Sequence, residues 1–243
     1  MDLLGKNALV TGSGIRLGRA ISLALGKAGC NLALHYNSSL EPVNQVKSEL
    51  ESMGRKASIF HQDLEDISSV PELMSRVCDE FGHVDILINN AGIYPLGTGK
   101  GSTPAKINRV FNVNLFSPWL LISAFAKQLP EGTHGKVINI SDGSVFHNGT
   151  DHFGYRVTKQ AINTITAMFA LELAPNITVN AIAPGTMLPL QGYEHVDLQA
   201  VAERQIPLKR IGSPEIIAEN VLHILSQDFM TGSVIRVDGG EFL

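Results

Sequence analysis

The chain has 243 residues, of which 44% are apolar, and a formal net charge of −4. This apolar content is typical of a globular protein and argues against a disordered chain. The charge is close to neutral and the sequence has no run of Lys or Arg, so we expect neither nucleic acid nor a membrane surface as a partner.

Cysteine usage and the N-terminal segment bear on the compartment. Cys30 and Cys78 are expected to be two small buried apolar residues rather than a disulfide pair, which favours the reducing cytoplasm. Residues 1–7 lack a charged leader followed by a long apolar run, so we expect neither a signal peptide nor a membrane span. The His, Cys, Asp and Glu residues show no metal-ligand spacing, and we expect no metal.

Strands and helices alternate in the expected secondary structure. A short apolar run over 7–11 predicts the first strand, and apolar residues at helical spacing predict a helix over 18–28. The later strands are expected over 31–35, 57–61, 85–89, 136–141, 177–183 and 233–237. The later helices are expected over 43–53, 70–81, one or two segments of 103–129, 155–173, 197–205 and 214–226.

The expected strands are apolar without clean polar alternation, as in a parallel sheet covered by helices on both faces. Alternating strands and helices indicate right-handed βαβ units. We therefore predict an α/β protein with a single doubly wound Rossmann-fold domain over residues 1–243 and about seven parallel strands. The loops 93–103 and 184–196 follow strands directly, so they should lie at the carboxyl edge, where such sheets bind ligands.

A glycine-rich turn, Thr-Gly-Ser-Gly-Ile-Arg-Leu-Gly over 11–18, follows the first strand. Its backbone N–H groups and the N-terminus of the next helix suit a pyrophosphate. The turn departs from G-x-G-x-x-G because Leu17 stands at the third glycine, and by itself it is also compatible with a simple tight turn. The residues of this turn that we expect to bind a cofactor are Gly12, Ser13, Ile15, Arg16, Leu17 and Gly18.

The end of the second strand bears on the choice between NAD(H) and NADP(H). An acid about 20 residues after the glycines would bind a ribose 2′-hydroxyl. Here Tyr36, Asn37 and Ser38 follow the strand, and the first acid is Glu41. Neutral donors together with Arg16 favour a 2′-phosphate, so we predict NADP(H). The alternative is a plain polar loop with Arg16 as a surface charge.

Seven short motifs in order resemble the short-chain dehydrogenase/reductase family, and the resemblance covers nearly the whole chain. The motifs are Thr11-Gly12 with Arg16 and Gly18, Asp63-Leu64, Asn89-Asn90-Ala91-Gly92, Asn114, Tyr155-x-x-x-Lys159, Pro184-Gly185 and Val237-Asp238-Gly239-Gly240. The resemblance implies an oxidoreductase with a small-molecule substrate, which forms a homotetramer. It also implies cofactor contacts at Asp63, Leu64, Asn90, Ala91, Gly92, Tyr155, Lys159, Pro184 and Gly185.

Tyr155 and Lys159 are four residues apart on one expected helix and therefore share a face. A phenol with a pKa of about 10 is a poor acid–base catalyst near neutrality. We expect the Lys159 ammonium to lower the pKa of Tyr155, which then serves as the proton donor. The resemblance implies that Lys159 also binds the nicotinamide ribose and that Asn114 holds a water in a proton relay. Without the other motifs, this pair would be interpreted as a surface pair.

The position thirteen residues before the tyrosine departs from the family pattern, because Asp142 stands where most members carry a serine. Reduction of a ketone builds an alkoxide. Two like charges about 4 Å apart repel by about 4 kcal/mol at an effective dielectric of 20, which is roughly a thousandfold in rate. A carboxylate at 142 instead suits a substrate with N–H donors or a ring nitrogen that gains a proton.

Arg16 and Asp142 together resemble the pteridine reductases, which reduce dihydropterins with NADPH under an aromatic ring that Tyr94 or Phe146 could supply. The alternative is that Ser141 or Ser144 takes the place of the serine and Asp142 is a turn residue. The chemistry would then be carbonyl reduction or alcohol oxidation, as in a 3-oxoacyl thioester reductase. A non-catalytic NADP(H)-binding regulator is a further alternative, since fold does not fix function.

Two loops near the expected site carry smaller expectations. His147 and His152 precede Tyr155 and are expected to be solvated. Met187, Leu188 and Leu190 follow Pro184-Gly185, where they would form either an apolar lid over the substrate or an ordinary surface loop.

Overall fold

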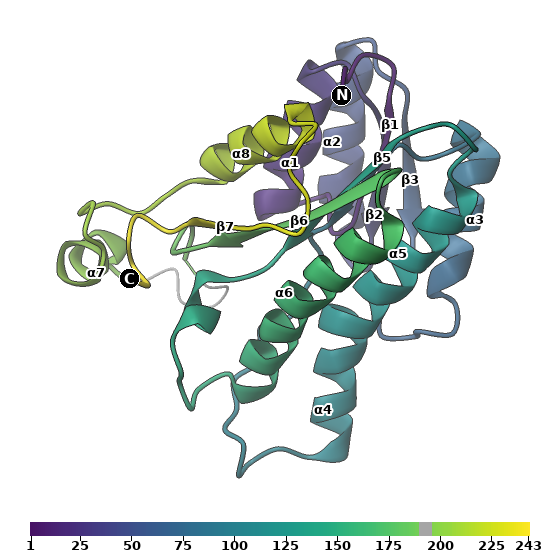
Figure 1. Ribbon diagram of the computed structural model, residues 1–243. Coiled ribbons are helices and arrows are strands. Elements are labelled where there is room, and N and C mark those ends of the chain that lie inside the picture. The colour runs from purple at the N-terminus through teal and green to yellow at the C-terminus, as the bar shows by residue number, and fades with distance from the viewer. Residues whose placement is uncertain (190–195) are drawn as a thin grey trace.

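The computed structural model describes residues 1–189 and 196–243. Its strands form one seven-stranded sheet in the order β3-β2-β1-β4-β5-β6-β7, and every neighbouring pair is parallel (Figure 1). The strands are β1 Asn7–Val10, β2 Asn31–Tyr36, β3 Ala57–His61, β4 Ile86–Asn89, β5 Gly135–Ile140, β6 Ile177–Pro184 and β7 Val234–Val237. The predicted doubly wound α/β sheet is confirmed.

Helices cover both faces of this sheet. The helices are α1 Arg16–Lys27, α2 Leu40–Ser52, α3 Val70–Phe81, α4 Pro104–Phe111, α5 Ser117–Gln128, α6 Phe153–Leu173, α7 Leu198–Gln205 and α8 Pro214–Ser226. Figure 1 shows α1, α2 and α8 on one side of the sheet and α3, α5 and α6 on the other. Among the described residues, no helix is long and apolar enough to cross a bilayer.

The sheet is buried on both faces because its strands carry apolar side chains on both. In β1, Ala8 and Val10 pack into the core cluster under α1, α2 and α8, whereas Leu9 packs into the cluster under α3, α5 and α6. All three side chains are buried. Period-two alternation sends successive residues to opposite faces, so a strand buried on both faces is apolar throughout.

The region predicted as one or two helices over 103–129 holds α4 and α5, joined by a π-helical turn at Asn112–Phe116. Such a turn inserts a residue into the helical ladder and is often found at functional sites. Other boundaries differ from the prediction by a few residues; α1, for example, begins at Arg16 rather than Gly18. This difference matters because Arg16 stands at the first turn of the helix.

The two cysteines are both free thiols. Cys30 is fully buried, as predicted, and burial raises the pKa of its thiol to about 12. Cys78 is only partly buried, and its Sγ lies 3.4 Å from Gln128 Oε1, so the prediction of a buried residue holds only in part here. The Cys78 position on α3 faces the gap beside α5, which apolar packing fills incompletely.

We expect Phe125→Ala to destabilise the fold by about 3–5 kcal/mol, because the ring is fully buried under the sheet and its loss leaves a cavity. Urea unfolding monitored by circular dichroism measures this loss. Phe229→Ala is the matched control, since Phe229 is fully exposed and its loss should leave the unfolding midpoint unchanged. Equal effects of the two substitutions would contradict the assignment of Phe125 to the core.

Candidate active site

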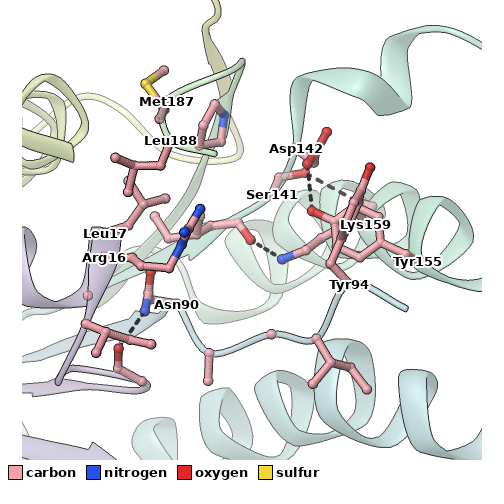
Figure 2. Close-up of a pocket in the computed structure, with 18 of the residues that line it drawn as sticks. Arg16, Leu17, Asn90, Tyr94, Ser141, Asp142, Tyr155, Lys159, Met187 and Leu188 are labelled. Carbon is pink, nitrogen blue, oxygen red and sulfur yellow. Dashed lines mark hydrogen bonds between the residues drawn. The ribbon is translucent and has the colours of Figure 1, made fainter. Parts of the chain in front are cut away.

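A cavity of about 810 Å³ lies at the carboxyl edge of the sheet. The strand order reverses between β1 and β4, which is where ligands bind in such sheets. The cavity is lined by the glycine-rich turn after β1, by residues after β2 and β4, by the β5–α6 loop and α6, and by residues after β6. Figure 2 shows Arg16 and Leu17 on one side of it and Asp142, Tyr155 and Lys159 on the other.

The glycine-rich turn is packed so tightly that side chains are excluded at two points. Gly12 has φ +64°, and a Cβ on Gly18 would overlap the Gly12 carbonyl oxygen. Asn90 fixes this turn, because its Nδ2 donates to Thr11 O at 2.8 Å and to Gly12 O at 3.1 Å. Figure 2 shows Asn90 beside Arg16 and Leu17. Thr11 Oγ1 in turn accepts from the backbone N–H groups of Asn90 and Ala91, each at 3.0 Å.

His35 also holds this turn, and the sequence analysis missed it. Its Nδ1 accepts from Gly12 N at 3.1 Å, so its Nε2 carries the proton and donates to Gln62 O at 3.0 Å. Its carbonyl accepts from both the backbone and the hydroxyl of Ser13. Burial lowers the pKa of His35 to about 4, so the ring stays neutral. Its only sequence signal was a polar residue at the buried end of a strand.

All the residues that we predicted to bind the adenosine end of the cofactor are among those that line the cavity. These residues are Arg16, Tyr36, Asn37, Ser38, Asp63 and Leu64. Asn37 Nδ2 donates to Asp63 Oδ1 at 3.3 Å, and the same oxygen accepts from Glu65 N at 2.9 Å. Arg16 has φ +52°, and its side chain makes none of the hydrogen bonds found among the described residues.

These features fit the pyrophosphate and ribose groups of a dinucleotide. The crowded glycines allow a ligand to approach the backbone closely, and the first turn of α1 presents N–H groups that lack intrahelical partners. The cationic Arg16 stands at that helix terminus. The residues that would hold the group are therefore the glycine-rich turn, Arg16 and the polar residues after β2.

Asn114 lies in the π-helical turn and is almost fully buried. Its Oδ1 accepts from Ile93 N at 2.8 Å, and its Nδ2 donates to Ile93 O at 2.9 Å. A Cβ on Gly92 would lie 3.4 Å from Asn114 Oδ1 and 3.7 Å from Lys159 Nζ. The side chain of Asn114 thus anchors the segment after β4 beside the lysine, and its place in a proton relay stays a prediction.

Tyr155, Asp142 and Lys159 meet at the end of β5. The Tyr155 hydroxyl donates to Asp142 Oδ2 at 2.6 Å (Figure 2). Lys159 Nζ donates to Ile140 O at 2.6 Å and lies 5.7 Å from the centroid of the Tyr155 ring. Tyr155 is 8% exposed and Lys159 is 5% exposed, so the three polar groups interact largely out of solvent.

The predicted lowering of the Tyr155 pKa by Lys159 was wrong. Burial and the neighbouring Asp142 carboxylate, to which the hydroxyl is hydrogen-bonded, raise the pKa of Tyr155 well above its ordinary value of 10. Burial also lowers the pKa of Lys159 to about 8, an effect that Asp142 partly opposes. The carboxylate touches the phenol and the ammonium does not, so the phenol keeps its proton.

The serines of the alternative, Ser141 and Ser144, both line the cavity beside Asp142, and which of the three side chains meets the substrate stays a prediction. The Ser141 hydroxyl donates to Asn163 Oδ1 at 2.6 Å and contacts Lys159 O at 3.3 Å, so it is engaged by α6. Ser144 contributes its backbone N–H to Asp142 Oδ1 at 2.7 Å. Asp142 is therefore both a turn residue and a neighbour of Tyr155, because its Oδ1 caps the turn and its Oδ2 accepts from the Tyr155 hydroxyl.

Of the two candidate aromatic rings, Tyr94 lines the cavity and Phe146 does not. Arg236 covers the Phe146 ring, with its Cζ 5.2 Å from the ring centroid. Tyr94 meets Tyr155 edge-on at 4.4 Å. Its ring also stacks on His152 with centroids 3.8 Å apart. The prediction of a solvated His152 was wrong, because the residue is only 7% exposed and lies against Pro95 O; His147 is exposed as predicted.

The segment after β6 borders the cavity as predicted. Pro184, Gly185, Met187 and Leu188 line it, and the predicted contribution of Leu190 lies outside the described residues. The sequence analysis missed Glu241, whose carboxylate accepts from the backbone N–H and the hydroxyl of Thr186, both at 2.8 Å. This contact is long-range, so no local motif could reveal it.

Comparisons with known proteins agree with this architecture. The profile of a family described as enoyl-(acyl carrier protein) reductase matches residues 12–241. The chain is 34% identical to 2-dehydro-3-deoxy-D-gluconate 5-dehydrogenase of Escherichia coli, over 98% of this chain and 96% of that protein. It is 33% identical to versicolorin reductase stcU of Emericella nidulans, again over 98% and 96%. The chain therefore belongs to the short-chain dehydrogenase/reductase family of oxidoreductases.

Solved structures of the same fold include two with NADP. One is FolM alternative dihydrofolate reductase 1 from Brucella canis, with a TM-score of 0.94 and 31% identity over 99% of this chain and 95% of that one. The other is a short chain dehydrogenase from Burkholderia cenocepacia, with a TM-score of 0.93 and 28% identity over all of both chains.

We expect His35 to make the fold acid-sensitive. Its pKa is about 4 when folded and about 6.5 when unfolded, so below pH 6.5 the unfolded chain binds more protons. Stability should fall by about 3 kcal/mol between pH 6.5 and 4, relative to His35→Gln. Urea unfolding across this range measures the difference. His134→Gln, at an exposed position, is the control and should keep the wild-type slope. A wild-type slope in His35→Gln would refute the assignment.

Proposed function

We propose that this chain is an NADPH-dependent reductase whose substrate is a dihydropterin-like heterocycle. The observation that carries the proposal is the 2.6 Å hydrogen bond from the Tyr155 hydroxyl to the Asp142 carboxylate inside the cavity. The bond supports a site with a carboxylate at its reacting end, where the alkoxide formed by reduction of a ketone would be repelled.

The cofactor part of the proposal rests on the opposite side of the cavity. The glycine-rich turn suits a pyrophosphate, and Arg16 with Tyr36, Asn37 and Ser38 suits a 2′-phosphate. When bound, NADPH supplies a hydride to the substrate. The structures of FolM from Brucella canis and of the Burkholderia cenocepacia dehydrogenase were both determined with NADP, which supports the same assignment here.

The residues of this chain supply the proton and the orientation. Tyr155 keeps its proton at neutral pH, because its pKa is raised by burial and by Asp142. The raised pKa makes the phenol a weak acid, so it gives up this proton only to a strong base, such as a ring nitrogen that gains negative charge as hydride adds. The Asp142 carboxylate can accept an N–H of the same heterocycle, and Lys159 offers a cation deeper in the site. Tyr94 provides an aromatic edge beside Tyr155, against which a flat ring can pack.

A second candidate function is reduction of a carbonyl or oxidation of an alcohol. It is favoured by the relatives at 33–34% identity, which are named as a versicolorin reductase and a 2-dehydro-3-deoxy-D-gluconate 5-dehydrogenase. The FolM structures from two Brucella species, at 31% identity, are named as dihydrofolate reductases and support the heterocycle instead. Asp142 is the residue on which the two candidates differ in chemistry.

We also propose that the protein is a cytoplasmic homotetramer. Large apolar side chains are exposed along α5 and α6, where a second copy could cover them; these are Trp119, Phe153, Val157, Met168 and Leu171. The two free cysteines, both with a thiol pKa raised by burial, suit a reducing compartment.

NADPH oxidation with a dihydropterin and with an acetoacetyl thioester, measured side by side, tests the substrate. We expect turnover of the dihydropterin. We expect Asp142→Ser to lower its kcat by about 100-fold or more, because the acceptor for the ring N–H is lost, and to leave turnover of the thioester equal or higher. Wild-type turnover of the thioester alone would overturn the proposal. Tyr155→Phe is the inactive control for both substrates.

The 2′-phosphate assignment predicts a cofactor-selective effect of Arg16→Ala. Loss of a charge-assisted contact should raise KM for NADPH by about 10- to 100-fold and leave KM for NADH within about twofold. Arg19→Ala is the matched control, since Arg19 lies on the same helix but pairs with Glu49 at 2.8 Å. Parallel increases for both cofactors would contradict the assignment.

A further inference from the structure

We propose that Arg156 is a positioning residue, which acts by holding the Asp142 carboxylate in the orientation that meets Tyr155. The proposal rests on the proposed function only in taking Asp142 and Tyr155 as the reacting pair. The sequence motifs did not single out this arginine, which directly follows Tyr155 in α6.

The guanidinium of Arg156 is bound by the loop that connects β5 to α6. Its Nη1 donates to Ser144 O at 2.7 Å. Its Nε donates to Asp151 O at 3.2 Å, and its Nη2 pairs with Asp151 Oδ1 at 3.1 Å. The loop wraps so closely that a Cβ on Gly149 would lie 2.9 Å from Arg156 Cζ. One side chain thus ties both halves of the loop to α6.

Ser144 connects this arrangement to the reacting pair. Its backbone N–H donates to Asp142 Oδ1 at 2.7 Å, while its carbonyl accepts from Arg156. The other carboxylate oxygen, Oδ2, accepts from Tyr155 at 2.6 Å. The contacts therefore close a ring through Tyr155, Asp142, Ser144 and Arg156, and the helix supplies the last side because Tyr155 and Arg156 are neighbours. Fixing Ser144 fixes which oxygen of Asp142 faces the cavity.

The middle of the loop has little else to hold it, although Phe146 lies under Arg236 at one end and His152 stacks on Tyr94 at the other. Residues 146–151 are exposed, and the one short turn in the loop, Gly143–Phe146, is capped by Asp142 itself. A guanidinium can bond the loop in two directions because its donors form a planar fork, which a lysine ammonium does not reproduce. Arg156 itself lines the cavity on the side of Asp142, and its hydrogen bonds among the described residues go to the β5–α6 loop. Its loss should therefore affect the chemical step rather than cofactor binding.

Arg156→Met tests the proposal through a split between kcat and KM. We expect kcat to fall by about 10- to 100-fold, as for a small misplacement of a catalytic group, with KM for NADPH within about twofold of wild type. Arg156→Lys should recover part of kcat, since one donor can still reach Ser144 O. Should Arg156→Met fail to fold by thermal melting, Arg156→Lys and Arg156→Gln carry the same comparison.

A double substitution shows whether Arg156 acts through Asp142. In the Asp142→Ser background, replacing Arg156 by Met should change kcat by less than about threefold, because the carboxylate that it orients is gone. The full effect of Arg156→Met in that background would overturn the proposal. So would an unchanged kcat in the single variant.

The matched control is Arg76→Met. Arg76 also reaches from a helix to a backbone carbonyl, His61 O at 2.9 Å, but it lies outside the cavity. This substitution should leave kcat within about twofold of wild type. An equal loss of kcat in Arg76→Met would show that any such arginine matters and would overturn the specific role of Arg156.

Two features of these experiments distinguish a failure of the Arg156 proposal from a failure of the proposed function. The Arg156 series is measured on whichever of dihydropterin or acetoacetyl thioester the wild type reduces, so a wrong substrate leaves the comparison intact. Hydrogen exchange at the Ser144 amide needs no substrate at all. It should accelerate by about tenfold or more in Arg156→Met and not in Arg76→Met. Unchanged exchange in Arg156→Met would overturn the proposal by itself.

Discussion

A short hydrogen bond between a phenol and a carboxylate, Tyr155 to Asp142 at 2.6 Å, governs the chemistry available to this site. Both groups lie at the end of β5, largely out of water, and burial together with the carboxylate raises the pKa of the phenol. The phenol therefore keeps its proton, and its hydroxyl satisfies one of the carboxylate oxygens. A site of this kind suits a substrate that takes up a proton and presents N–H donors, and it disfavours one that develops negative charge.

The two ends of the cavity are held by different means. At the cofactor end, backbone groups dominate. His35 in β2 and Asn90 after β4 hold the glycine-rich turn from the two sides of β1. At the reacting end, side chains on a long helix meet an irregular loop, and Arg156 joins the two. The first arrangement presents N–H groups to phosphates with little freedom to shift. The second orients individual oxygen atoms, so one residue in the loop can redirect the chemistry while the fold stays the same.

Much of the fold could be predicted from the sequence because its signals are local. Apolar runs in β1 and β4 and helical spacing in α3 reflect which faces are buried, and burial is what periodicity records. The glycine-rich turn was likewise visible, because only glycine tolerates the approach of Gly18 to Gly12 O. The role of His35, by contrast, could not be predicted from a polar residue at the end of a strand, since its contact with Gly12 joins two strands. The pKa of Tyr155 was predicted in the wrong direction because helical spacing indicates only that Lys159 is near, not which group touches the phenol.

The parallel sheet, the glycine-rich turn and an aspartate at the position that usually holds a serine all follow from the order of residues along the chain. That Asp142 faces Tyr155, that Ser141 is bound to α6, and that Tyr94 rather than Phe146 lines the cavity became visible in the folded chain. The two kinds of feature depend on interactions of different range. Secondary structure follows from neighbours along the chain, whereas the orientation of a side chain in an irregular loop follows from hydrogen bonds to residues of other elements, which no local pattern encodes.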